Sequence, residues 1–518
     1  MKPYIHKIPF KEISLLSQTA EEYVYEPKKL SSFITGEPSV RNFGRQIKER
    51  AQVNRDLLVE ELLSQNKTSN QASIDNIELL RNNNTFTVTT GHQICLFTGP
   101  LYSLYKIIST LKLADKLKAE FPENNFVPVF WMATEDHDFE EINHVFLGEK
   151  KLTWNSNQTG PVGRFSTNDM ADFLNELNME NTSDLTKILT SIYQSSSTLA
   201  EAHNKVIDHL FGHFGIVILD ADSHVLKKEM IPIFAKELLE RKSEEIVLRQ
   251  SEKLQKLGHK QQVTPREINL FYQKNGLRER IVFENNRYQV VNTELSFSEK
   301  EILTELENHP ERFSPNVVMR PMYQEKILPN LGYIGGPGEL AYWLQLKEAF
   351  EFYQLDFPLL VLRNSALLLP SNIVRKISEL PFELSQYFHS NDELIKQYVE
   401  DQSTINLESE IAEIEKIFEL TREKVVEIDF TLEKTVIAEL KRAQNSMKKI
   451  RKKTLKAEKT NHSVALNRIN KIKACFFPSG TFQERKSNLL EFYEEELIKN
   501  IHYNLIPLED NLTLIELN

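Results

Sequence analysis

Cysteine is scarce in this chain of 518 residues, which contains only Cys95 and Cys475. Two cysteines so far apart exclude a disulfide framework, a C-x-x-C motif and a cysteine-rich metal site, and they favour a reducing compartment. Long apolar runs are also missing, because segments such as VPVFWMA and FPLLVL stop far short of the roughly 18–20 residues of a membrane span. The N-terminus has no apolar stretch typical of a secretory signal. We therefore expect a soluble, cytoplasmic protein with no membrane partner and no metal site.

Positive charge is in deficit as well. The 63 Lys and Arg residues face 74 Asp and Glu residues, for a formal net charge of −11. Such a charge opposes non-specific binding to nucleic acid or to anionic membranes. The low content of glycine and proline, 16 and 20 residues, excludes a collagen-like or low-complexity chain. A globular protein of this length is expected to form two to four domains.

Strand and helix patterns alternate in the first part of the chain. The β-branched run TFTVTT (85–90) precedes a segment, 101–120, with apolar residues at helical spacing, and the apolar run FVPVFWM (126–132) follows. Further buried strands are predicted at 215–220 and 357–370. We predict an α/β fold with a doubly wound parallel sheet, Rossmann-like, over residues 1–385. Polar or charged segments at about 155–205 and 240–320 are expected to be insertions.

The third part of the chain predicts an antiparallel coiled coil within residues 386–475. Apolar residues recur at 4,3 spacing from Leu407 to Ile428 and again from Val436 to Ala457, separated by a short connection at 429–431. The first helix is acid-rich and the second strongly basic, which favours charge pairing between them, with an anionic ligand on the basic helix (441–473) as the alternative. Residues 476–518 are expected to pack back on the core.

Three loops carry residues suited to chemistry. The glycine-containing loop 90–100 opens into a helix, so its backbone N–H groups favour an anion, with Lys106 placed to reach a phosphate. It is neither a Walker loop nor a dinucleotide fingerprint. Cys95 lies between apolar residues and is expected to be inert packing.

The second loop, Glu135-Asp136-His137-Asp138, follows a buried strand. Such a cluster needs cations, hydrogen-bond partners or ligands, and the alternatives to a ligand site are a helix cap and a structural salt-bridge cluster. In the third loop, GGPGE places Glu339 in the first turn of a helix, where it suits recognition of an amine. A tight turn with core aromatics is the alternative there.

Several motifs, taken together and in order, resemble the bacillithiol biosynthesis cysteine-adding enzyme family. They are GHQ, LFTGPLY, EDHDF, EINHV, VVMRPMYQE, YIGGPGELAYW and FFPSGTFQER, and they extend over nearly the whole chain. The resemblance implies a Rossmann-like core with connective-peptide insertions, similar to class I aminoacyl-tRNA synthetases, and a coiled coil associated with homodimerisation. It also implies a ligase that joins L-cysteine through its carboxyl group to the amine of glucosaminyl malate.

The family's motifs also imply a set of site residues. The catalytic candidates are Glu135, Asp136, His137 and Asp138. The candidates for substrate or nucleotide binding are Gly91, His92, Gln93, Thr98, Gly99, Tyr102, Lys106, Asn143, Gly335, Gly336, Glu339, Tyr342 and Trp343. Arg320, just before the third loop, is a further binding candidate. The resemblance assigns no role as base to His92 and none as nucleophile to Cys95.

Chemistry adds one expectation about the co-substrate. A carboxylate is a poor acyl donor, so we expect ATP, with Mg, to activate it, and we expect no tightly bound cofactor. Two alternatives remain open: a non-catalytic nucleotide-binding scaffold whose coiled coil recruits a partner, and a tRNA-directed aminoacyl transfer enzyme. The net charge of −11 and the absence of aromatic residues among the lysines of 448–459 argue against a nucleic-acid partner.

Overall fold

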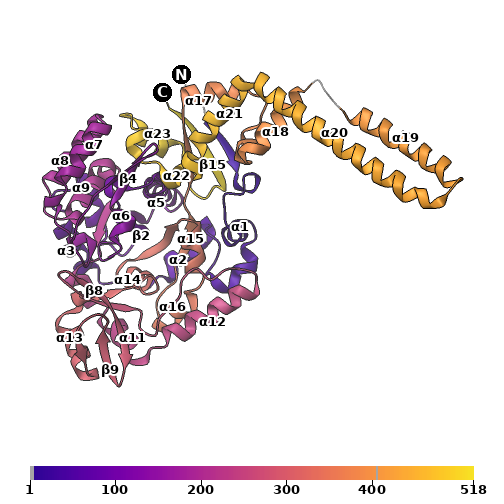
Figure 1. Ribbon diagram of the computed structural model, residues 1–518. Helices are drawn as coiled ribbons and strands as arrows, with labels where there is room; N and C mark the ends of the chain where they lie inside the picture. The colour runs from indigo at the N-terminus through magenta and orange to yellow at the C-terminus, as the bar shows by residue number, and fades with distance from the viewer. Residues whose placement is uncertain (1–4, 404–406, 518) are drawn as a thin grey trace. The chain divides into compact units, whose positions relative to one another are not determined.

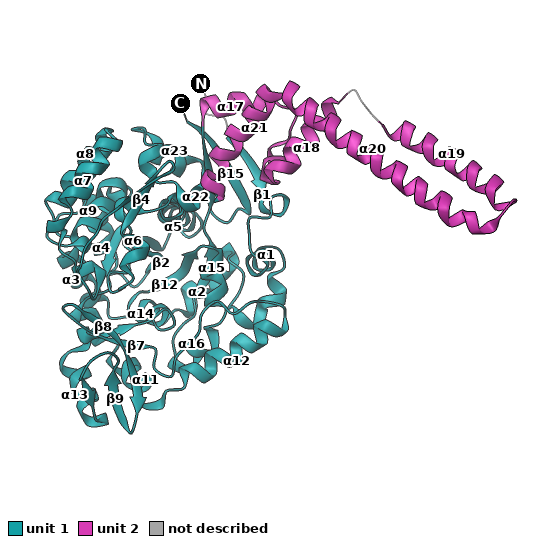
Figure 2. Ribbon diagram, in the orientation of Figure 1, with its two compact units in different colours: residues 1–369, 481–518 teal, residues 370–480 magenta. Residues whose placement is uncertain are grey.

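The computed structural model describes residues 5–403 and 407–517, and its chain forms two compact units (Figure 2). Unit 1 combines Met1–Leu369 with Thr481–Asn518, and unit 2 is Pro370–Gly480. Unit 2 therefore starts before residue 386, because α17 (Ser371–Ser378) packs on α21 (Ser463–Phe476) within it. Among the described residues, no helix has both the length and the apolar composition of a membrane span.

A five-stranded parallel sheet forms the centre of unit 1, which confirms the predicted Rossmann-like class. Its strand order is β13-β12-β2-β3-β6, and every neighbouring pair is parallel. The strands are β2 (Thr85–His92), β3 (Asn125–Met132), β6 (Val217–Asp220), β12 (Asn330–Gly335) and β13 (Leu359–Leu362). Helix α5 (Leu101–Glu120) connects β2 to β3. The crossover brings the carboxyl ends of all five strands to one edge.

Strand β3 shows why this segment of the sequence is apolar without alternation. Val129 and Trp131 pack into one hydrophobic cluster, whereas Phe130 and Met132 pack into another. All four side chains are fully buried. Because successive side chains of a strand point to opposite faces, this sheet is covered on both sides.

Residues 357–370 form two strands instead of the single buried strand predicted. β13 ends at Leu362, and β14 (Ser365–Pro370) joins a second sheet of order β1-β15-β14. The break occurs where the backbone N–H of Asn364 donates to Ser109 Oγ at 2.9 Å, outside either sheet. β1 (Ile5–Pro9) and β15 (Asn511–Leu517) pair antiparallel, so both ends of the described chain share this sheet.

The two expected insertions form separate substructures of unit 1. Residues 155–205 contribute α7 (Ala171–Glu180), α8 (Asp184–Gln194) and the start of α9 (Leu199–Phe211). Residues 240–320 contain α12 (Ser243–Lys256), α13 (Glu299–Asn308) and an antiparallel sheet of order β10-β9-β8-β7-β11. The strands of this sheet are β7 (Leu270–Lys274), β8 (Leu277–Glu284), β9 (Arg287–Val290), β10 (Ser296–Phe297) and β11 (Phe313–Pro315).

Unit 2 contains the predicted antiparallel hairpin. α19 (Glu408–Val426) and α20 (Glu433–Asn461) run side by side and are joined by a short turn that includes Phe430–Leu432 (Figure 1). Gln444 Nε2 donates to Glu415 Oε1 at 2.7 Å between the helices. Neither helix has a fully buried residue. A two-helix hairpin alone therefore leaves much of its apolar seam accessible.

Candidate functional site

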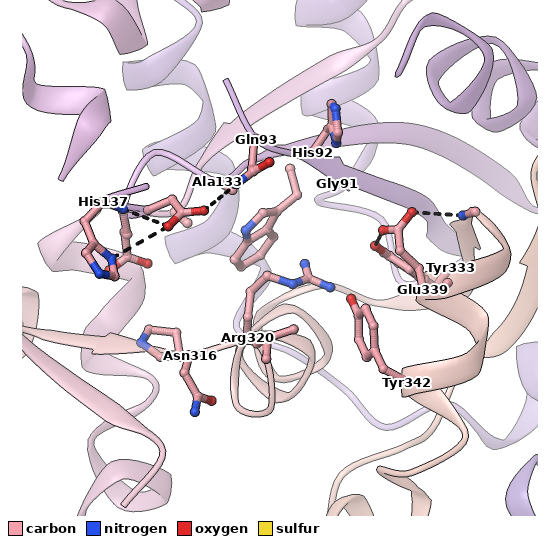
Figure 3. A pocket seen from close by; sticks show the side chains of 18 of the residues that line it. Gly91, His92, Gln93, Ala133, His137, Asn316, Arg320, Tyr333, Glu339 and Tyr342 are labelled. Atoms are coloured by element: carbon pink, nitrogen blue, oxygen red, sulfur yellow. Dashed lines mark hydrogen bonds and ion pairs between the residues drawn. The ribbon is translucent and has the colours of Figure 1, made fainter. Parts of the chain in front are cut away.

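A pocket of about 840 Å³ opens at the carboxyl edge of the parallel sheet. Many of the predicted site residues line it, namely Gly91, His92, Gln93, Tyr102, Glu135, Asp136, His137, Arg320, Gly336, Glu339 and Tyr342. Thr98, Gly99, Lys106, Asp138, Asn143, Gly335 and Trp343 are outside this lining. Figure 3 shows Arg320 in the middle of the pocket, with His137 on one side and Glu339 on the other.

The N-terminus of α5 is closed by the C-terminal segment. Leu101 N donates to Ser487 O at 2.9 Å, and Asn488 Nδ2 donates to the carbonyls of Phe97 and Gly99 at 3.0 and 2.8 Å. Gly99 has φ +67°, and a Cβ there would lie 2.6 Å from Cys95 Cβ. The backbone N–H groups of Gly99 and Leu101, expected to bind an anion, thus donate to the carbonyls of Leu96 and Ser487.

Lys106 connects β2, α5 and α15 (Pro337–Trp343) from a buried position. Its Nζ lies 2.7 Å from Glu339 Oε2 and donates to the carbonyl of Gly91. Glu339 also accepts from Tyr333 Oη at 2.6 Å and from Gly336 N at 2.9 Å. Burial favours the protonated acid, but Lys106 and these donors hold the pKa of Glu339 below its usual value. Lys106 is therefore paired with Glu339 and lies outside the pocket lining.

Glu135 lies at the end of β3 beside a fully buried lysine. Lys227 Nζ, from α10 (His224–Lys228), is 2.5 Å from Glu135 Oε1 and 3.6 Å from Asp222 Oδ1. Arg164 donates to both carboxylate oxygens of Asp222, at 2.6 and 2.9 Å. Burial raises the pKa of Glu135, an effect that Lys227 opposes. Burial and the Asp222 charge raise the pKa of Asp220 to about 6.

Asp136 and His137 are held by neighbours from other segments. Gln93 Nε2 donates to Asp136 Oδ2 at 2.8 Å, and Arg278 Nη1 lies 2.6 Å from His137 Nδ1. Burial and the Arg278 charge lower the pKa of His137. A neutral His137 that accepts from Arg278 at Nδ1 carries its proton on Nε2, so it can donate from Nε2 but cannot act there as a base.

Asp138 and Asn143 occupy other positions. Asp138 is exposed, and the carbonyl of Asn143 accepts from Trp154 N at 2.7 Å. The helix that follows Asp138 is only the short α6 (Phe139–Ile142), because β4 (His144–Leu147) pairs with β5 (Lys150–Thr153) immediately afterwards. Trp343 is fully buried and stacks on Tyr333 at 4.5 Å between ring centroids. It belongs to the core beneath the pocket.

Four arginines line the pocket: Arg278, Arg320, Arg363 and Arg485. Of these four, Arg320 is the one predicted from the sequence as a binding candidate. Its guanidinium lies 5.7 Å from the Trp131 ring and 5.4 Å from the Tyr333 ring, and its buried Nη2 has no hydrogen-bond partner among the described residues. Arg278 comes from β8 in the second insertion, where no sequence motif marks it. Arg485 follows Glu484 in the FQER motif, but nothing there indicates a pocket residue.

Possible metal ligands and the thiol of Cys95 are the remaining reactive groups to place. Within residues 5–403 and 407–517, no three His, Cys, Asp or Glu side chains are grouped to hold a metal ion. Burial raises the pKa of Cys95 to about 12 and lowers that of His92, 3.9 Å away, to about 3. An uncharged thiol beside a neutral imidazole is a weak nucleophile. The pocket instead offers carboxylates for a cation and guanidinium groups for anions.

Comparisons with known proteins agree with this architecture. Residues 4–364 match a family model described as "Bacillithiol biosynthesis BshC, N-terminal Rossmann-like domain", and residues 366–517 match "Bacillithiol biosynthesis BshC, C-terminal coiled-coil domain". A Flavobacterium psychrophilum protein named "Putative cysteine ligase BshC" is 41% identical, with 98% of this chain and 99% of the relative covered. A Chlorobaculum tepidum protein of the same name is 30% identical, with 85% and 84% covered. The chain therefore belongs to the bacillithiol biosynthesis BshC family, as its motifs predicted.

Proposed function

We propose that this protein is a ligase that joins the carboxyl group of L-cysteine to the amine of glucosaminyl malate as an amide. The observation that carries the proposal is Arg320, whose guanidinium lies between His137 and Glu339 and whose buried Nη2 has no hydrogen-bond partner among the described residues. Such a guanidinium suits a carboxylate, and acidic groups beside it suit an amine. The name of the relatives, "Putative cysteine ligase BshC", supports cysteine as one of the two substrates.

Glu135 is the proposed proton acceptor. Glu135 and Asp136 both line this end of the pocket, but only Glu135 has a raised pKa. The pKa of Asp136 is lowered by hydrogen-bond donors such as Gln93, although burial opposes that effect. The substrate amine attacks the activated carboxyl carbon, a C–N bond forms, and the bond to the leaving group breaks with its electron pair. The proton lost by the amine goes to Glu135. His137 Nε2–H is available to stabilise the leaving oxygen.

ATP, escorted by Mg, is the proposed activating co-substrate. A free carboxylate does not acylate an amine near neutral pH, so its oxygen must first become part of a better leaving group. The four arginines of the pocket suit a polyphosphate as well as carboxylates. ATP would leave after each turnover, so it is a substrate and not a resident cofactor.

The test is a reaction of the purified protein with L-cysteine and glucosaminyl malate, with and without Mg-ATP, followed by mass spectrometry. We expect the condensed thiol only with ATP, and AMP or ADP in the same sample identifies the activation route. Glu135→Gln is expected to abolish turnover, with the exposed Lys228→Gln as the matched control. Product without ATP contradicts the activation step. Folded protein that gives no product contradicts the ligase and leaves the scaffold and tRNA alternatives.

We also propose that the hairpin of unit 2 forms a homodimer. Glu413, Glu419 and Glu423 lie on the face of α19 away from its apolar seam, and Lys441, Lys448 and Lys459 lie on the corresponding face of α20. A two-fold arrangement places each acidic face against the partner's basic face. Light scattering is expected to give a dimer whose dissociation constant rises with salt. A monomer at micromolar concentration contradicts the proposal.

A further inference from the structure

Arg363 is a nearly buried guanidinium with one donor left over. It is 4% exposed, and its two terminal nitrogens bind Glu484, with Nη1–Oε2 at 3.0 Å and Nη2–Oε1 at 2.6 Å. Its remaining donor, Nε, is buried and has no hydrogen-bond partner among the described residues. A buried N–H group without a partner is rare in folded proteins and indicates a missing acceptor.

The unpartnered Nε borders the pocket beside a glycine turn. A Cβ on Gly336 would lie 3.6 Å from Arg363 Nε and 3.5 Å from Glu339 Oε2, and all three residues line the pocket. A Cβ on Gly338 would meet nothing within 4 Å. This turn therefore leaves room beside Arg363 for a ligand. The neighbouring Glu339 is neutralised by Lys106, 2.7 Å away, so it does not repel an anion strongly.

Arg485 adds a second positive charge to the same end of the pocket. It is exposed, lines the pocket, and forms no ion pair within the described part of the chain. Its neighbours in sequence are fixed: Gln483 exchanges two 2.9 Å hydrogen bonds with the backbone of Leu368, and Ser487 O accepts from Leu101 N. The backbone on either side of Arg485 is thus tied to unit 1.

Tyr102 completes the arrangement from α5. Its ring lies 5.6 Å from Arg363 Cζ, and both Arg363 and Arg485 act electrostatically on its phenol. Burial nevertheless raises the pKa of Tyr102 far above neutrality, so the hydroxyl remains a donor. A buried N–H, an exposed guanidinium and a phenol O–H are three donors at this end of the pocket, and the nearby carboxylate, Glu339, is already paired with Lys106.

We propose that Arg363, Arg485 and Tyr102 form an oxyanion subsite, separate from Arg320, that holds a carboxylate or phosphate group of a substrate. The inference rests on the proposed function only for the identity of that substrate. If the group is a carboxylate, it belongs to the dicarboxylate part of the amine substrate. If it is a phosphate, it belongs to the activating nucleotide.

The experiment measures binding of two probes, malate and inorganic phosphate, by isothermal titration calorimetry of the full-length protein. Arg485→Gln is expected to weaken binding of one probe about tenfold or more. Lys486→Gln is the matched control, because Lys486 is the next residue, lies over the Phe146 ring at 4.9 Å and is outside the pocket lining. The probe whose affinity falls identifies the source of the anion.

A second variant tests the buried partner. Arg363→Gln combined with Glu484→Gln removes both charges of the pair together, which avoids leaving one buried charge alone. This double variant is expected to lose binding of the same probe while it still unfolds in a cooperative thermal transition. The proposal is overturned if wild-type protein binds neither probe, or if Arg485→Gln binds both as wild type does. A third outcome separates the two proposals. If the wild-type protein binds a probe but makes no amide product, and Arg485→Gln weakens binding of that probe, the subsite stands and the proposed function fails.

Discussion

Replacing Lys227 by methionine tests the buried charge network beneath the pocket. Lys227 is fully buried, and its Nζ is the cation nearest to Glu135 Oε1, at 2.5 Å, with Asp222 Oδ1 at 3.6 Å. Methionine keeps most of the side-chain volume but removes the charge. The adjacent Lys228 is exposed, so Lys228→Met is the matched control, expected to change stability by less than about 0.5 kcal/mol.

The magnitude follows from the distances. Two unit charges separated by 2.5 Å in an effective dielectric of about 20 attract by about 7 kcal/mol, part of which offsets the desolvation of Lys227. Removing one partner of a buried ion pair typically destabilises a protein by about 3–5 kcal/mol. Arg164 still neutralises Asp222 in the variant, so most of the loss arises at Glu135. We expect Lys227→Met to lower the free energy of unfolding by about 3–5 kcal/mol at pH 8.

The loss should depend on pH with a defined sign. Burial already raises the pKa of Glu135, and Lys227 opposes that rise, so the variant raises it further. A carboxyl group whose pKa is higher in the folded than in the unfolded state stabilises the fold when protonated. The difference between wild type and Lys227→Met should therefore be largest at pH 8 and shrink toward pH 5.

Urea denaturation followed by tryptophan fluorescence measures this directly. The three tryptophans, Trp131, Trp154 and Trp343, are all buried and all lie in unit 1, so the signal reports on the unit that contains Lys227. The double variant with Glu135→Gln should recover part of the loss. A loss below about 1 kcal/mol, or one that is equal at pH 5 and pH 8, would refute the electrostatic role of Lys227.

Three further results are expected. Gly163→Ala should lower the free energy of unfolding by about 1–3 kcal/mol in the same urea assay, because the alanine Cβ would lie 2.6 Å from Thr134 Cβ. The control is Gly338→Ala, where the new Cβ meets nothing within 4 Å, and equal stability of the two variants contradicts the prediction. In the ligase assay, Asp136→Asn should reduce kcat/KM by about tenfold or more. Replacing the exposed Asp138 by Asn should reduce kcat/KM by less than about twofold, and a larger loss in Asp138→Asn than in Asp136→Asn would show that Asp138 is the carboxylate that the reaction needs. Burial raises the pKa of Cys95 to about 12, so Cys95 should not react with iodoacetamide at pH 8 until urea unfolds the protein. An adduct at Cys95 in the folded protein, located by peptide mass spectrometry, contradicts this prediction.

Local patterns were sufficient to predict much of the architecture. The apolar run of β3 and the helical spacing of α5 define a parallel crossover, because burial on two faces leaves no polar alternation. The 4,3 spacing likewise predicts the hairpin of α19 and α20. Both signals lie within contiguous segments, where the sequence period equals the structural period.

The remaining site residues depend on contacts between distant segments. Arg278 reaches His137 across 141 positions of the chain, and Glu484 reaches Arg363 across 121. Lys227 follows a strand that the sequence predicts. Its full burial could not be inferred, because the next residue of the same helix, Lys228, is also a lysine and is exposed. The anion site expected at α5 differs from the structure for the same reason, because Ser487 and Asn488 arrive there from the far end of the chain.

The return of the C-terminal segment to unit 1 has a consequence for synthesis on the ribosome. Glu484, Asn488 and strand β15 all belong to Thr481–Asn518, which is translated only after the whole of Pro370–Gly480. Unit 2 can therefore begin to fold before unit 1 has its full set of residues. A premature stop codon after unit 2 would remove Arg485 from the pocket and uncover the start of α5, although most of the Rossmann-like domain had already been made.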